Sequence, residues 1–248
     1  MWATTRCAPL ALSPLSLIFS YKSEKCCTEQ PLVAPDGGTQ ARFGTNPVTM
    51  GVPATSKNPA VILDMATSVV ALGKVRVNYN KQLQMEDGAL IDGKGEPTTD
   101  PAVMFGLTGT DGTAAIPTGA LRPFGEYKGA GLALMCELLA GAIGGGGTIQ
   151  PGNARTDHII NNKVVVVFDP QKLTPASEIE KEADAMLDYL RSTPAARGKQ
   201  VLVAGEPENC SLQERTANGL PIDSNTWAQL CQLAANDGSV VPPPVDFI

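Results

Sequence analysis

The chain contains a single histidine, His158, among its 248 residues. Catalysis by Ser-His-Asp or Cys-His groups and binding of zinc by histidine-rich sites each need a histidine at the reacting centre. His158 lies in a polar stretch, residues 155–162, that is typical of a turn leading into a strand. An exposed or capping role fits this histidine better than a catalytic one. The sequence therefore disfavours hydrolase and zinc chemistry.

Positive charge and long apolar runs are also scarce. The chain has 19 Lys and Arg against 25 Asp and Glu, a net charge of −6. Nucleic-acid binding depends on clusters of Lys and Arg, which this sequence does not have. A spanning helix needs about 18 consecutive apolar residues, and the apolar stretch 8–19 is interrupted by Pro9 and Pro14. We therefore expect neither a nucleic acid nor a membrane as a partner.

The cysteines form no metal-binding pattern. The six are Cys7, Cys26, Cys27, Cys136, Cys210 and Cys231. None belongs to a CxxC motif or has a histidine at ligand spacing, so we predict no metal site. Cys136 lies in an apolar helical pattern and is expected to be a small buried side chain. A reducing compartment fits this usage, and we predict a cytoplasmic protein.

Residues 1–30 differ from the rest of the chain, because they are rich in Ser, Cys and Leu and have no sustained periodicity. Arg6 precedes an apolar run, which is a weak likeness to a targeting peptide without a clear cleavage site. We expect an unmatched leader at 1–30, either disordered or misassigned to the chain. The cofactor-binding and catalytic core is expected at 31–248, with the fold beginning near Pro31.

The periodicity of the remaining chain predicts alternating strands and helices. Strands are expected at 48–52, 60–64 and 163–169, the last buried on both faces because it is a continuous β-branched run. Helices are expected from Thr67 or Ser68 to about 84, at 129–143, after a Ser177-x-x-Glu180 capping box, at 208–218 and at 223–238. Residues 86–101 are expected to form a long loop that is functional or mobile.

The strand at 60–64 ends on a carboxylate, Asp64. In open α/β sheets ligands gather beyond the carboxyl ends of strands, so Asp64 is a candidate catalytic residue. In the alternative, Asp64 with Thr67 or Ser68 satisfies the first N–H groups of the next helix. The strand alone does not decide between the two.

Lys128 lies just before the apolar helix, where a cation is unfavourable by ~0.3 to 1 kcal/mol. An anion would offset this, because helix N–H groups and an ammonium can together hold a phosphate. In the alternative, Glu126 neutralises Lys128. The four glycines 144–147 follow a helix rather than a strand, so they are not a phosphate loop. No GxGxxG or GxxxxGK[ST] motif occurs, so the sequence gives no support for a Rossmann or P-loop fold.

Five motifs occur in a characteristic order: Gly44-Thr-Asn-Pro47, Leu63-Asp-Met-Ala-Thr-Ser68, Pro97-Thr-Thr-Asp-Pro101, Tyr127-Lys-Gly129 and Gly131-Leu-Ala-Leu-Met-Cys-Glu-Leu-Leu-Ala-Gly141. From about Pro31 to Gly238 the chain resembles the malate/L-lactate dehydrogenase family, which lacks a Rossmann fold and includes ureidoglycolate dehydrogenase and 2,3-diketogulonate reductase. The resemblance implies an α/β fold of this non-Rossmann type, with a mixed sheet and flanking helices and with the family's N-terminal helical part missing.

The resemblance further implies a homodimeric oxidoreductase that uses NAD or NADP. It would move a hydride between the nicotinamide and C2 of a small 2-hydroxy or 2-oxo acid. Asp64 would orient or tune the group that transfers the proton, and Arg155 would hold the substrate carboxylate by a bidentate pair. The implied cofactor contacts are Ala60, Val61, Ile62, Leu63, Asp64, Met65 and Ala66 on the strand, Tyr127 and Lys128 before the helix, and Gly205, Glu206 and Pro207.

The chain departs from the family pattern in one respect. It has no N-terminal Ser-His-Gly motif with a nearby Arg, where the family's histidine is the general acid, and His158 does not match that position. Loss of a general acid lowers rates by about 10²- to 10⁴-fold. The chain is therefore either a dehydrogenase with a misassigned N-terminal segment or a catalytically dead fragment that retains nucleotide binding or dimerisation. A binding module unrelated to redox chemistry is the third alternative.

Overall fold

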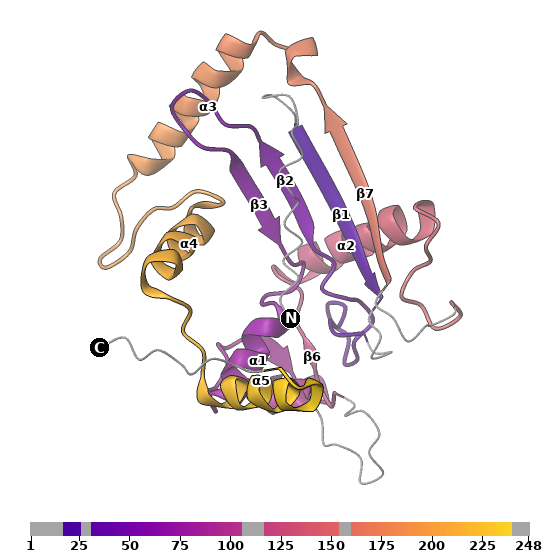
Figure 1. The fold of residues 1–248 in the computed structure, drawn as a ribbon. Helices are drawn as coiled ribbons and strands as arrows, with labels where there is room; N and C mark the ends of the chain where they lie inside the picture. Colours follow the sequence, from indigo (N-terminus) through magenta and orange to yellow (C-terminus); the bar gives the residue numbers. More distant parts are fainter. Residues whose placement is uncertain (1–16, 26–30, 106–116, 154–159, 240–248) are drawn as a thin grey trace.

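The computed structural model describes residues 17–25, 31–105, 117–153 and 160–239, and its strands form two sheets (Figure 1). The large sheet has the order β3 (Val61–Met65), β2 (Val48–Val52), β1 (Leu17–Lys25) and β7 (Ile160–Phe168). The small sheet has the order β5 (Pro97–Thr98), β4 (Leu90–Ile91) and β6 (Ala120–Leu121). With the helices around them, these sheets confirm the predicted α/β class.

Neighbouring strands in both sheets are antiparallel. Among the described residues, parallel pairing occurs in the isolated bridge between Val33 and Leu121. The predicted mixed sheet is therefore almost entirely antiparallel. The residues between β2 and β3 simply reverse the chain. The rule that places ligands beyond the carboxyl ends of strands applies to open α/β sheets with parallel strands. That reasoning for Asp64 was therefore wrong, and its role has to rest on its contacts.

The fold includes a segment that precedes Pro31, where we expected it to begin. β1 lies between β2 and β7 and pairs with both, which Figure 1 shows at the centre of the large sheet. Its sequence, Leu-Ile-Phe-Ser-Tyr-Lys-Ser-Glu-Lys, is rich in the β-branched and aromatic residues that favour strands in its first half. β2 and β7 meet in one sheet because β1 joins them.

β7 is half exposed rather than buried on both faces, so that prediction was wrong. Val165, Val166, Val167 and Phe168 are 37–50% exposed. β7 is an edge strand that pairs with β1 alone in the described part of the chain. A continuous β-branched run predicts a strand, but the elements that pack against the strand decide how much of its surface is buried.

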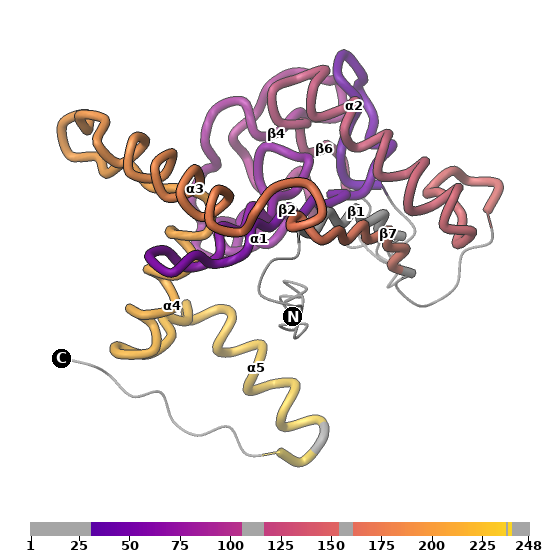
Figure 2. The backbone as a smooth tube through the Cα atoms, turned by 90° about the horizontal axis from the view of Figure 1, so that it is seen from above, coloured from indigo at the N-terminus to yellow at the C-terminus, as the bar shows by residue number. Residues whose placement is uncertain are grey.

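Five α-helices are described: α1 (Leu72–Asn80), α2 (Tyr127–Cys136), α3 (Ala176–Arg191), α4 (Glu206–Asn218) and α5 (Ser224–Asp237). α2 continues as the π-helix η2 (Glu137–Ile143), and two short 3-10 helices are η1 (Pro101–Met104) and η3 (Pro170–Lys172). Figures 1 and 2 show α2 on one side of the large sheet and α4 and α5 toward the other.

The helix ends follow the sequence signals in part. Asp223 caps α5 by accepting a hydrogen bond from Thr226 N at 2.9 Å, and Gly219 and Gly238 end α4 and α5 as expected. The capping box at Ser177 was wrong, because α3 begins directly after Pro175 with no side-chain cap. Pro175 already supplies a fixed φ and no N–H at this boundary.

Residues 86–101 are not a free loop, contrary to expectation. Leu90 and Ile91 are 0% and 6% exposed and pair with β5 and β6 in the small sheet. Leu90 packs in a core cluster with Val33, Val75 and Leu121. The glycines and acids that suggested a loop lie in the turns around two short strands, of which β4 is buried.

Candidate functional site

Asp64 lies on β3 directly opposite Thr49 of β2, and the Thr49 hydroxyl donates a hydrogen bond of 2.9 Å to Asp64 Oδ1. The side chain of Asp64 is exposed. The alternative role as a helix cap is wrong, because α1 begins only at Leu72 and has no side-chain cap. Asp64 Oδ2 accepts no hydrogen bond from the described residues. One carboxylate oxygen is thus held and the other faces outward.

The residues that follow β3 are fixed from two sides. Thr67 is buried, and both its N–H and its hydroxyl donate to Thr45 O, at 2.9 and 3.0 Å. Thr67 O accepts a hydrogen bond from Phe124 N at 3.0 Å. Because the N–H, hydroxyl and carbonyl groups of Thr67 make these tertiary hydrogen bonds, Thr67 does not start a helix. They tie the end of β3 to the loop 44–47 and to the turn before α2.

Gly129 brings the first turn of α2 against the end of β3. A Cβ at this position would lie 2.9 Å from Thr67 O and 2.7 Å from Phe124 N, and it would clash with Phe124 O. The two backbones approach this closely because glycine has no side chain. Tyr127 and Lys128, the two residues before Gly129, are thereby placed beside the end of β3.

Lys128 has an exposed ammonium whose described neighbour is the ring of Tyr127, with 6.0 Å from Nζ to the ring centroid. Glu126 does not pair with it, since its carboxylate lies 4.0 Å from the guanidinium of Arg122. Among the described residues no carboxylate lies within ion-pair distance of Lys128. The ammonium is therefore available to an anion. The N–H groups of Lys128, Gly129 and Ala130 are not, because they donate to the carbonyls of Gly125, Phe124 and Glu126.

Gly205 brings the start of α4 to the same strand. It has φ +91°, and a Cβ there would lie 3.2 Å from Ile62 O and 3.4 Å from Ile62 N. Both the left-handed backbone and the close approach favour glycine. Gly205, Glu206 and Pro207 thus lie beside β3 near Ile62, while Tyr127 and Lys128 lie near its other end.

Glu206 is partly buried and its carboxylate accepts three hydrogen bonds. Its Oε1 accepts hydrogen bonds from Arg191 Nη2 at 2.7 Å and Nε at 3.2 Å, and its Oε2 accepts one from Val203 N at 2.8 Å. The Val203 N–H and then the Arg191 guanidinium hold the pKa of Glu206 below its ordinary range. The carboxylate is committed to these partners, so it fixes the start of α4.

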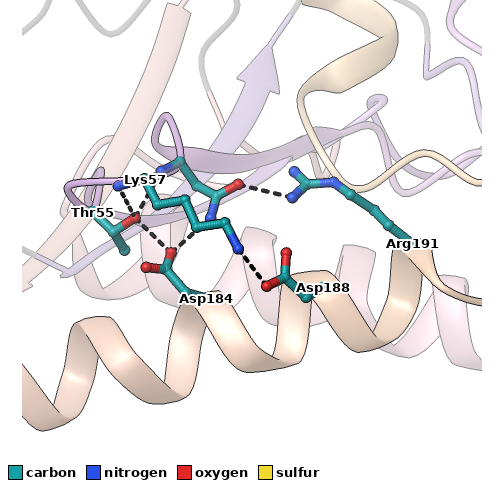
Figure 3. A network of polar contacts seen from close by, with 6 residues as sticks. Thr55, Lys57, Asp184, Asp188 and Arg191 are labelled. Atoms are coloured by element: carbon teal, nitrogen blue, oxygen red, sulfur yellow. Dashed lines mark hydrogen bonds and ion pairs between the residues drawn. The ribbon is translucent and has the colours of Figure 1, made fainter.

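Arg191 belongs to a wider polar network that joins α3 to the β2–β3 connection (Figure 3). Arg191 Nη1 donates to Asn58 Oδ1 at 2.8 Å, and Asn58 Nδ2 donates to Asp184 Oδ1 at 2.6 Å. Thr55 also donates to Asp184, which lowers the pKa of this carboxyl, and Lys57 pairs with Asp188. Sequence reasoning missed this network, although the spacing of residues 184, 188 and 191 on one helix face was a signal for it.

A second missed contact lies between loop 44–47 and the junction of α2 with η2. Glu137 is 3% exposed, and its two oxygens accept from Asn46 Nδ2 and Ile149 N, each at 2.9 Å. Asn46 is 0% exposed, has φ +36° and also donates to Ala133 O at 3.1 Å. The signal in the sequence was a single acid within the apolar run 129–143.

Cys136 is fully buried, as predicted from its apolar surroundings. Burial, and then the neighbouring Glu137, raise the pKa of the Cys136 thiol to about 12. This thiol is a packing residue at neutral pH because the reactive thiolate is suppressed.

Arg155 and His158 lie outside the described residues. Within the described ranges no group of three or more His, Cys, Asp and Glu side chains is placed to hold a metal ion. In the same part of the chain no helix is both long and apolar enough to cross a membrane.

Comparison with known proteins gives one family over most of the chain. The family model described as "Malate/L-lactate dehydrogenase" matches residues 24–231. Hydroxycarboxylate dehydrogenase B of Escherichia coli K12 is 37% identical over 210 residues, which cover 84% of this chain and 55% of that protein. L-lactate dehydrogenase of Cupriavidus necator is 37% identical, with 86% and 58% covered.

Solved structures agree with the sequence comparison. A provisionally assigned malate/lactate dehydrogenase from E. coli superposes with a TM-score of 0.78 at 33% identity, covering 91% of this chain and 60% of that one. Sulfolactate dehydrogenase from Methanocaldococcus jannaschii gives 0.65 at 29% identity, with 90% and 60% covered. The chain spans little more than half the length of these relatives. Over that span, the sequence and the fold place it in the malate/L-lactate dehydrogenase family.

Proposed function

We propose that this chain is the cofactor-binding part of an oxidoreductase that transfers a hydride between NAD or NADP and C2 of a small 2-hydroxy or 2-oxo acid. The observation that carries the proposal is the convergence on β3 of the start of α2 and the start of α4, two segments about 80 residues apart in the sequence. Family membership supports the reaction class. The relatives named for hydroxycarboxylate, lactate and sulfolactate support the kind of substrate.

The residues fit a dinucleotide by their chemistry. Lys128 is a cation without a carboxylate partner in the described chain, and it stands at the start of α2, where the positive end of the helix dipole favours an anion. Residues 60–66 offer strand backbone, and Gly205 to Pro207 border it near Ile62. In the proposal these three segments hold the cofactor, with Tyr127 beside Lys128. When bound, the cofactor supplies or accepts the hydride.

Asp64 has the role of a positioning group in the proposal. Thr49 holds its Oδ1, so the carboxylate keeps one direction and presents Oδ2 to the site. From there it would orient, or tune, the group that moves the substrate proton. Arg155 would hold the carboxylate of the substrate through a bidentate pair, a geometry for which arginine is suited.

We also propose that the protein acts as a homodimer. The support is exposed apolar surface on two elements: Leu134, Met135 and Leu138 on α2 and η2 are 42–46% exposed, and residues 165–168 of β7, a strand that contacts η2, are 37–50% exposed. Exposed apolar surface marks sites of association. A cytoplasmic location stays a prediction from the cysteine pattern.

The proposal is tested by titrating the full 248-residue chain with NADH and NADPH and following the quenching or enhancement of the nicotinamide fluorescence. Pyruvate, oxaloacetate and oxalurate are then added and oxidation of the cofactor is recorded. Lys128→Ala should weaken binding about tenfold or more, because a charge-assisted contact is lost. Lys181→Ala, which removes an exposed lysine of α3, is the matched control and should bind as the wild type does.

Binding with turnover supports the proposed reaction. Binding without turnover with any of the three acids would favour a fragment that retains nucleotide binding only. If neither cofactor binds, or if Lys128→Ala and Lys181→Ala bind equally well, the site at β3 and α2 is wrong.

A further inference from the structure

Glu137 is a buried carboxylate that the proposed cofactor site does not itself contain. It is 3% exposed and is the first residue of the π-helix η2. π-helical turns that continue an α-helix are uncommon and frequently occur at functional sites. A buried charge costs free energy that an apolar side chain would not, and among the described residues no lysine or arginine pairs with Glu137. The hydrogen bonds of the carboxylate, rather than its packing, therefore account for an acid at this position.

These hydrogen bonds fix the backbone of loop 44–47 at Asn46. The side-chain NH2 group of Asn46 donates to Glu137 Oε1 at 2.9 Å and to Ala133 O at 3.1 Å, and the Cys136 thiol donates to Asn46 O at 3.5 Å. Residues 133, 136 and 137 lie on one face of the helix because they are three and four positions apart. Asn46 has φ +36°, a conformation that is costly for most residues and that asparagine tolerates better than others. One helix face thus holds the loop in a backbone conformation that it would otherwise rarely adopt.

On one side of Asn46, the loop is joined to the start of α2. Thr45 O accepts hydrogen bonds from both the N–H and the hydroxyl of Thr67, at 2.9 and 3.0 Å. Thr67 O in turn accepts a hydrogen bond from Phe124 N at 3.0 Å, in the turn that precedes Lys128. A displacement of the loop would therefore move the end of β3 and the turn that carries Lys128.

On the other side of Asn46, the loop leads into β2. The strand begins at Val48, and the next residue, Thr49, donates the hydrogen bond of 2.9 Å that holds Asp64 Oδ1. The carboxylate of Asp64 and the ammonium of Lys128 thus depend on the same loop, the first through Thr49 and the second through Thr45.

We propose that Glu137 and Asn46 are a pair of positioning residues that set the placement of Asp64 relative to Lys128 in the cofactor site. Both side chains of the pair are buried, so they act through loop 44–47 and not by contact with a ligand. The inference rests on the proposed function, which supplies the dinucleotide whose binding is measured. The coupling of Glu137 to Thr67 can be measured without any cofactor.

The test uses two single variants of the full chain and their combination. Asn46→Asp keeps the size of the side chain and tolerates positive φ, but it replaces the donor by a carboxylate that faces Glu137. Glu137→Gln leaves a buried N–H without an acceptor. In Asn46→Asp/Glu137→Gln the donor and the acceptor are exchanged, so the two side chains can form their hydrogen bond again, although Ala133 O loses its donor.

Val75→Ala is the control for a general loss of stability. Val75 is fully buried in the core cluster around Leu90, and it makes no hydrogen bond to loop 44–47 with its side chain. Urea unfolding of every variant gives its free energy of unfolding, so that exchange through global unfolding can be subtracted.

The first readout is hydrogen exchange at the N–H groups of Thr67 and Phe124, followed by NMR without cofactor. The second is fluorescence titration with NADH and NADPH. We expect Asn46→Asp and Glu137→Gln each to raise local exchange at both N–H groups about tenfold, and to weaken dinucleotide binding about fivefold to tenfold. The combined variant should recover part of both losses. Val75→Ala should stay within about twofold of the wild type in local exchange and in binding.

Three results would overturn the inference, and they differ in what they leave standing. If local exchange at Thr67 is the same in Glu137→Gln and Val75→Ala, or if the combined variant recovers nothing, the pair only packs the interior. If exchange responds as expected but every variant binds the dinucleotide as tightly as the wild type, the coupling ends before the site. In both cases the proposed function stands. If the wild type binds neither NADH nor NADPH, the proposed function is wrong, and with it the role of the pair in placing a cofactor.

Discussion

Replacing Glu137 by Gln tests the buried contact that joins α2 to loop 44–47. The side chain keeps its size, so the change isolates the hydrogen bonds. In the native protein both carboxylate oxygens accept hydrogen bonds, from Asn46 Nδ2 and from Ile149 N. An amide has one oxygen and one NH2 group. In either orientation, the NH2 group therefore faces a donor, and one buried N–H loses its acceptor.

The expected loss follows from these contacts. A hydrogen bond to a charged group contributes about 1.5–3 kcal/mol, and a buried donor without an acceptor costs about 1–3 kcal/mol. The amide no longer buries a charge, which offsets part of this cost. We therefore expect Glu137→Gln to lower the free energy of unfolding by about 2 kcal/mol. In a chain of this length that lowers Tm by roughly 4–8 °C.

The assay is equilibrium unfolding in urea, with the midpoint and the slope both measured so that a change in unfolding mechanism is recognised. Glu182→Gln is the matched control, because Glu182 lies on the exposed side of α3 and has no described partner. It should change the free energy of unfolding by less than about 0.5 kcal/mol. If the two variants unfold at the same urea concentration, Glu137 does not hold loop 44–47.

Three further predictions concern packing, reactivity and pH. Gly129→Ala should destabilise by about 3 kcal/mol or more in thermal unfolding, whereas Gly131→Ala, with open space around it, should be neutral or stabilise by up to about 1 kcal/mol. Cys136, with its pKa of about 12, should stay unlabelled by iodoacetamide at neutral pH until the protein unfolds, as mass spectrometry would detect. Folding lowers the pKa of Glu206 below its ordinary value of 4.5. Its contribution to the free energy of unfolding is therefore present above pH 4.5 and is lost as the pH falls through the lowered pKa of the folded state. Arg191→Ala should therefore lower Tm at pH 7, and the difference from wild type should shrink in acid.

Local signals predicted the elements whose ends are set by neighbouring residues. The strand 48–52 lies between Pro47 and Pro53, and α5 begins after Asp223 and ends at Gly238, because these residues act through backbone geometry and short-range hydrogen bonds. The ordered motifs also predicted the family and the α/β class. Such features depend on residues close together in the sequence, so no knowledge of the packing is needed.

The exposure of side chains and the pairing of strands were decided by contacts between segments that lie far apart in the sequence. The run 163–168 is a strand as expected, yet it is half exposed because it forms the edge of the sheet. Residues 90 and 91 are buried because β5 and β6 pair with β4 on either side. Thr67 does not start a helix, because the carbonyl of Thr45, 22 positions earlier, takes both of its donors.

The candidate site shows the same division. The sequence by itself predicted three segments for it: the strand with Asp64, the start of the apolar helix with Lys128, and Gly205 to Pro207. Only the tertiary structure decided that they meet, since Gly129 and Gly205 let two helix starts approach one strand more closely than a side chain would allow. It also decided that Arg191 holds Glu206 at the start of α4. The ammonium of Lys128, in contrast, has no carboxylate partner among the described residues, and Glu126 lies 4.0 Å from Arg122.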